Sequence, residues 1–80
     1  MRENGPVSGT QRKAVAIAVR VELARAGVSG NEMARRLGMP SSTFGRRMTA
    51  DLPFTADHLV NIAHELGIPV ATLFPDEVAA

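Results

Sequence analysis

Glycine and proline divide this 80-residue chain into short segments, and those segments have the apolar spacing of helices. Gly27, Gly38 and Gly67 each follow a stretch in which apolar residues recur at intervals of three and four. Glycine is the residue most often found just after the last turn of a helix. No segment alternates between apolar and polar residues with the period of a strand. The sequence therefore predicts an all-α fold, a compact domain of four to five helices.

The first helix is expected over residues 10–26 and ends at Gly27. Its apolar residues form one stripe of Ala14, Ile17, Val21 and Ala24, with Val15, Val19 and Leu23 beside it. Arg20 and Arg25 lie outside both rows, so we expect them to face water. Residues 1–9 contain too few apolar side chains to order themselves and are predicted to form a flexible N-terminal arm.

The second helix has the clearest start signal in the chain. Ser29 is expected to cap it, and Glu32, three residues later, to return the hydrogen bond in a capping box. Val28 and Met33 occupy the positions of a hydrophobic staple. The helix stops at Gly38 after two turns, which is too short for it to be stable alone, so it must pack against its neighbours.

A third helix is predicted over residues 41–49, with Phe44 and Met48 facing inward. At 100° per residue, Ser42 and Arg46 lie on the opposite side, with Thr43 and Thr49 flanking them. Gly45 lies inside this helix, where glycine costs about 1 kcal/mol relative to alanine. Two interpretations are open: another backbone approaches closely at Gly45, or the glycine is simply tolerated.

The fourth helix is expected to begin at the capping residue Thr55 and to bury Leu59, Ile62, Ala63 and Leu66. Residues 70–74 form a last helical turn, and residues 76–80 a C-terminal tail. These boundaries predict one domain over residues 10–75.

The composition of the chain excludes several classes of protein. The chain has no cysteine, so it has neither disulfides nor thiolate zinc ligands, and no apolar run approaches the roughly 20 residues of a membrane span. No signal-peptide core follows the first residues, so we expect a cytoplasmic protein. Net charge is +3 over residues 1–28, +3 over residues 29–50 and −5 over residues 51–80. A basic front and an acidic back are typical of a protein that turns one face to a polyanion, although ordinary solvated charge gives the same totals.

Catalytic patterns are lacking. His58 and His64 are six residues apart on one predicted helix, so they point in different directions and cannot bind a metal together. Both are expected to be helix-surface histidines. No serine is placed to form a triad with them, and no glycine pattern resembles a phosphate loop. We predict no enzymatic activity, no metal site and no cofactor.

The stretch from Ser29 to Met48, SGNEMARRLGMPSSTFGRRM, resembles the helix-turn-helix of the phage repressor and Cro type, also called XRE-like. The small Ala34 and the turn residue Gly38 fit two helices that cross at a wide angle. The following stretch LVNIAHELGIPVATLF, residues 59–74, is similar to the closing helices of the same family. The resemblance covers about residues 17–74 and implies a lambda-repressor-like fold.

The family docks its second motif helix in the DNA major groove, and lambda and 434 repressors are the examples by which that geometry is known. Carried over to this chain, the resemblance implies that Ser41, Ser42 and Arg46 reach base edges. Arginine can pair bidentately with guanine, whereas serine is a permissive reader. The resemblance also implies that four residues contact the DNA backbone: Gly30, Asn31, Thr43 and Arg47.

The chain departs from the family pattern at three places. Leu23 and Met48 stand where many relatives carry an arginine and a glutamate, so an apolar contact should replace an ion pair. Ala50 stands where a glycine commonly ends the recognition helix. Arg47 takes a position often filled by an aliphatic residue, so its stem is expected to pack while its head extends to a phosphate.

The resemblance thus predicts sequence-specific binding of a double-stranded DNA operator by a small bacterial or phage transcriptional regulator in the cytoplasm of its host cell. Relatives bind as two-fold dimers, and this chain offers little beyond residues 70–74 as an interface, which favours a weak homodimer formed on DNA. No small-molecule ligand is expected. The alternative is a protein-interaction module of the same fold, antitoxin-like or an adaptor, with little DNA binding.

Overall fold

The computed structural model describes residues 9–74, which form four α-helices and one short 3₁₀ helix. The elements are α1 (Gly9–Ala26), α2 (Gly30–Arg36), α3 (Ser41–Met48), α4 (Ala56–Leu66) and the 3₁₀ helix η1 (Val70–Leu73). No strand occurs within these residues, which confirms the predicted all-α class. The expected arm, apart from Gly9, and the expected tail lie outside the described residues.

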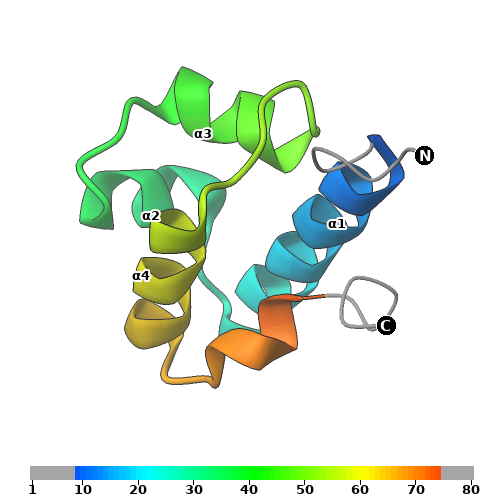
Figure 1. Ribbon diagram of the computed structural model, residues 1–80. Helices are drawn as coiled ribbons and strands as arrows, with labels where there is room; N and C mark the ends of the chain where they lie inside the picture. The colour runs from blue at the N-terminus through cyan, green and yellow to red at the C-terminus, as the bar shows by residue number, and fades with distance from the viewer. Residues whose placement is uncertain (1–8, 75–80) are drawn as a thin grey trace.

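The helices enclose a single core (Figure 1). In this view α3 lies across the top, α1 runs down the right side, α4 stands at the left and η1 closes the lower side. α1 packs against α3, α4 and η1, and α2 packs against α3. This arrangement leaves the outer side of α3 uncovered.

Each element contributes one side chain that is almost fully enclosed. These side chains are Val19, Met33, Phe44, Ile62 and Leu73, from α1, α2, α3, α4 and η1 in turn. Such short helices gain their stability from packing rather than from intrinsic propensity. The orientation of α3 therefore depends on the whole core.

Local signals place the helix ends as expected. The Ser29 hydroxyl accepts a hydrogen bond from the Glu32 N–H at 3.0 Å and caps α2. Gly38 has a φ of 68°, the left-handed conformation that ends α2 and turns the chain toward α3. Thr55 caps α4 by accepting from the His58 N–H at 3.1 Å. The helix boundaries lie within one or two residues of those predicted.

The main apolar stripe predicted for α1 is not the face that the helix buries, although Val19 and Leu23 of the row beside it are buried. Ile17 is 57% exposed and Val21 41% exposed, and Ala24 is also exposed. The helix instead buries Ala16, Val19 and Leu23. Apolar residues are spread almost evenly around α1, so its periodicity does not select a face. Contacts with α3, α4 and η1 select it.

The apolar side chains at positions 23 and 48 both belong to the core region. Leu23 is 4% exposed, and the half-buried Met48 packs against the same core. A Cβ atom placed on Gly30 would lie 2.7 Å from Met48 Cε, so the start of α2 and the end of α3 are closely packed. At Gly45, by contrast, no described atom lies within 4 Å of an added Cβ, so the close approach considered from sequence does not occur within this part of the chain.

Ala50, directly after the cap of α3, has a φ of 69°, although it is not a glycine. This left-handed conformation costs a residue with a Cβ about 1–2 kcal/mol. Ala50 therefore holds a strained backbone conformation that a glycine would adopt freely.

Replacing Ala50 with glycine should raise the free energy of unfolding by about 1 kcal/mol, because glycine adopts this conformation freely and only part of the gain is offset by its unfolded-state entropy. Urea titration followed by circular dichroism measures this change. Ala24→Gly, in the exposed interior of α1, is the control and should destabilise by about 1 kcal/mol. A loss of stability in Ala50→Gly would contradict the strain assigned to this position.

Candidate nucleic-acid interface

The outer face of α3 presents the side chains predicted to read bases. Ser41, Ser42 and Arg46 are exposed, while Phe44 on the opposite side is 1% exposed. The Arg46 side chain makes no hydrogen bond or ion pair with any residue from 9 to 74, so its guanidinium is free to bind an external acceptor. Thr43 is half-buried at the edge of this face.

The start of α2 lies next to the end of α3. Gly30 is half-buried against Met48, and Asn31 is exposed. The Ser29 hydroxyl already accepts from Glu32, whereas the Asn31 side chain makes no hydrogen bond within the described chain. The structure therefore brings the two α2 residues predicted to contact the DNA backbone close to α3, with one side chain available to an external partner.

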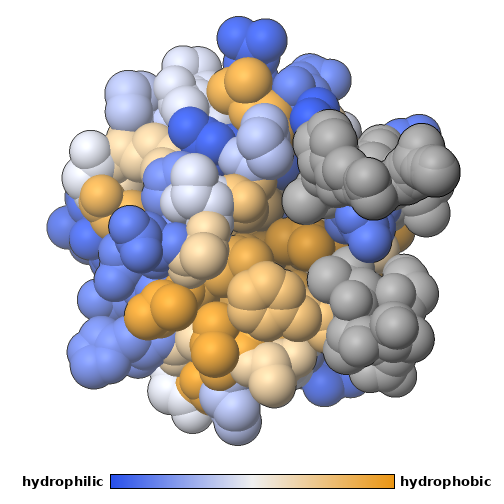
Figure 2. Space-filling view, in the orientation of Figure 1, coloured by the Kyte–Doolittle hydropathy of each residue, from blue (hydrophilic) through white to orange (hydrophobic). Residues whose placement is uncertain are grey.

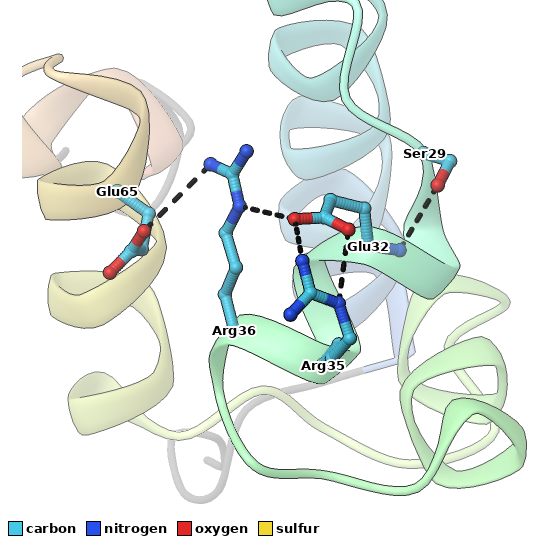
Figure 3. Close-up of polar contacts among 5 residues, drawn as sticks. All are labelled: Ser29, Glu32, Arg35, Arg36 and Glu65. Carbon is cyan, nitrogen blue, oxygen red and sulfur yellow. Dashed lines mark hydrogen bonds and ion pairs between the residues drawn. The ribbon is translucent and has the colours of Figure 1, made fainter.

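Glu32 uses its carboxylate differently from the prediction (Figure 3). Its oxygens accept from Arg35 Nε at 3.2 Å and from Arg36 Nε at 2.9 Å, and Arg35 Nη2 donates to it as well. The expected return bond to the Ser29 N–H is replaced because a carboxylate binds guanidinium more strongly than a neutral amide. These bonds, that from Arg35 first, lower the pKa of Glu32.

Arg36 extends this network to another helix, because its Nη1 lies 3.8 Å from Glu65 Oε1 on α4 (Figure 3). Two arginines of the motif are thus balanced by two carboxylates. The positive charge of the helix-turn-helix is carried mainly by α3.

Arg47 is half-buried, and its Nη1 donates to the carbonyl oxygen of Pro53. Its Nε is buried with no hydrogen-bond partner among the described residues. The head of this side chain thus holds the loop between α3 and α4, whereas the sequence predicted only a contact with a phosphate. Arginine has five N–H donors, so the contact with Pro53 leaves others for a phosphate.

His58 lies half-buried at the surface of α4, where its imidazole has a structural role that the sequence did not predict. Its Nδ1 accepts from the Thr55 N–H at 3.1 Å while its own backbone N–H donates to the Thr55 hydroxyl, which completes a capping box for α4. The imidazole also stands edge-on to Phe54, with ring centroids 6.4 Å apart. Burial lowers the pKa of His58, and the positive charge of Arg47 lowers it further. His64, by contrast, is exposed as predicted.

The capping role of His58 predicts a pH-dependent stability. Its pKa in the folded protein lies below the ordinary 6.5, so the unfolded chain takes up the proton more readily. The contribution of His58 to the free energy of unfolding should be fully present above pH 6.5. It should decrease as the pH falls from there through the folded pKa. Thermal unfolding at several pH values between about pH 5 and pH 8 measures this dependence. In His58→Gln the melting temperature should change less with pH than in the wild type. His64→Gln is the matched control, and a profile flattened equally by both variants would contradict the assignment.

Two basic residues near α3 were not singled out from sequence. Lys13 and Arg20, both on α1, line a shallow groove with Met48, Thr49 and Ala50 at the end of α3. Their spacing of seven residues places them on one face of α1, and this spacing was the available signal. Nothing in the sequence showed that this face lies against α3.

Two kinds of structural feature do not occur within residues 9–74. That region contains no group of three or more histidine, aspartate or glutamate side chains arranged around a common point. None of its helices combines the length and apolar character needed to span a bilayer.

Comparison with known proteins agrees with the helix-turn-helix fold. Residues 23–75 match the family model described as the bacteriophage CI repressor helix-turn-helix domain. A comparison with curated proteins gives no significant match. Among solved structures, the clp gene regulator ClgR from C. glutamicum is similar, with 24% sequence identity and a TM-score of 0.73. The alignment covers 79% of this chain and 82% of that chain, and at this identity it indicates a shared fold.

Proposed function

This chain belongs to the bacteriophage CI repressor helix-turn-helix family, and we propose that it binds a double-stranded DNA operator sequence-specifically, with α3 in the major groove, as a small transcriptional regulator. The observation that carries the proposal is the two-sided character of α3. Its inner side is anchored by the fully buried Phe44, and its outer side exposes Ser42 and Arg46, whose guanidinium has no partner among residues 9–74. A rigid helix with free donors on its open face is what base reading in the major groove requires.

Base reading is assigned to Ser41, Ser42 and Arg46. Arg46 is the specificity residue, because a guanidinium can donate two hydrogen bonds to O6 and N7 of one guanine. The serine hydroxyls both donate and accept, so they adapt to several bases.

Four residues are assigned to the DNA backbone: Gly30, Asn31, Thr43 and Arg47. Gly30 and Asn31 offer an N–H group and a side-chain amide from the start of α2. Thr43 lies at the edge of the reading face. Arg47 would keep its bond to Pro53 and use its remaining N–H donors, so it would hold the α3–α4 loop and a phosphate together.

The proposed regulator acts as a weak two-fold dimer on half-sites about 34 Å apart. Leu73 is fully buried within its own domain, whereas Phe74 is 38% exposed beside a small apolar cavity lined by Val15, Phe54 and Leu59. Figure 2 shows that hydrophobic residues gather in the middle and lower part of the face that it views. Because little of η1 remains for a partner, the dimer would form chiefly on DNA. Binding requires no cofactor or small molecule, and the site of action is the cytoplasm of a bacterial host cell.

A gel-shift titration tests the proposal. The protein should bind random-sequence duplex at low salt, with an affinity that falls steeply as salt rises. Selection from a random duplex library should then enrich one short, two-fold symmetric sequence. Failure to bind any duplex at low salt would refute DNA binding and favour a module that binds another protein through the same fold.

A further inference from the structure

Among the positive side chains outside α3, some are paired with carboxylates and others are not. Arg25 pairs with Glu22 at 3.4 Å, and Arg35 and Arg36 share Glu32. Lys13 and Arg20, in contrast, have neither an ion pair nor a side-chain hydrogen bond to any described residue. Both are exposed, so their charge is available to an external anion.

These two residues border a groove of about 200 Å³ between α1 and the end of α3. α1 contributes Lys13, Ala16, Ile17 and Arg20, and the other wall is formed by Met48, Thr49 and Ala50. Figure 1 shows the first half of α1 beside the end of α3. The groove therefore lies between α1 and the carboxyl end of α3, the helix whose outer side is the proposed reading face.

The negative end of α3 does not cancel this positive charge. Three of its last four carbonyl groups already accept hydrogen bonds: Thr49 N–H donates to Gly45 at 3.0 Å, Ala50 N–H to Arg47 at 3.2 Å and Leu52 N–H to Arg46 at 3.1 Å. Asp51 accepts from the Thr49 hydroxyl at 3.3 Å, and no carboxylate of the described residues lines the groove itself. An anion entering the groove would meet two cations and few free acceptors.

We propose that this groove binds the DNA phosphodiester backbone next to the major groove that α3 enters, with Lys13 and Arg20 each neutralising one phosphate. The inference rests on the proposed function and extends its contact surface to α1. A second copy of the chain is a poorer occupant, because in a two-fold contact each copy would bring the same two cations and no carboxylate from this groove.

The test compares two double variants that remove the same net charge. Lys13→Gln with Arg20→Gln should make the slope of log K against log salt shallower by about two on random duplex, about one unit for each phosphate that is no longer neutralised. Arg25→Gln with Arg35→Gln removes two arginines that are already paired with carboxylates, so its slope should stay near that of the wild type. All four side chains are exposed, so both variants should keep the wild-type melting temperature.

Equal slopes for the two double variants would overturn the inference, because net charge alone would then explain the weaker binding. A changed sedimentation mass for the Lys13 and Arg20 variant, with an unchanged salt slope, would assign the groove to a second copy and also overturn it. A wild-type protein that binds no duplex refutes the proposed function itself, whereas a wild-type binder with equal variant slopes refutes only the groove.

Discussion

Replacing Phe44 with alanine should destabilise the domain by about 3–5 kcal/mol, the largest effect expected from a single substitution in this chain. The ring is 1% exposed and anchors α3 in the core. It packs edge-on against Phe54, with centroids 5.6 Å apart and planes 69° apart. Alanine would remove both the burial and this aromatic packing and would leave a cavity that a small core fills poorly.

Urea unfolding followed by circular dichroism measures this effect. A domain of this size has only about 5–15 kcal/mol of stability, so a large part of it would disappear. DNA affinity at elevated temperature should fall with it, although no group on the outer face of α3 has been removed. Val60→Ala is the matched control, because Val60 is 52% exposed and its truncation should cost less than about 0.5 kcal/mol. An unchanged unfolding midpoint for Phe44→Ala would show that Phe44 does not anchor α3 in solution.

Replacing Arg46 with alanine should weaken specific DNA binding by about 1–3 kcal/mol, which is roughly 5- to 150-fold in affinity. The side chain is exposed and has no partner in residues 9–74, so the folded protein should keep its melting temperature. Preference at one base pair of the operator should relax, because alanine cannot donate the two hydrogen bonds to that base. Competition titrations with the selected operator and with single-base variants of it measure both effects.

Arg35→Ala is the control for Arg46, since it also removes an exposed arginine from the helix-turn-helix. Arg35 is bound to Glu32, so its removal should change specific and random binding little. If Arg46→Ala weakened specific and random binding equally, Arg46 would bind a phosphate and base readout would belong to the serines.

Local chemistry determined the helix boundaries. Ser29 and Thr55 cap the helices that follow them, and Gly38 takes the left-handed conformation that the turn requires. These signals act within about four residues along the chain, so they can be read without knowing the fold. The same holds for α3, where the strong contrast between Phe44 and Arg46 predicted the buried and exposed sides.

The sequence alone could not predict which of several nearby groups a polar side chain would bind. The sequence predicted that Glu32 would cap α2, but its carboxylate accepts hydrogen bonds from two arginines. The sequence did not predict that His58 completes the capping box of α4. Each of these side chains had more than one partner within reach. Packing and charge in the folded state selected among them.

The tertiary structure alone decided which face of α1 is buried. Apolar residues surround this helix, so burial of Val19 and exposure of Ile17 follow from contacts with α3, α4 and η1. The same contacts bring Lys13 and Arg20 beside the end of α3, a segment distant from them along the chain. The sequence by itself determined where the helices begin and end, because capping and turn geometry are local. The fold decided which faces meet, because burial depends on residues that are far apart in sequence.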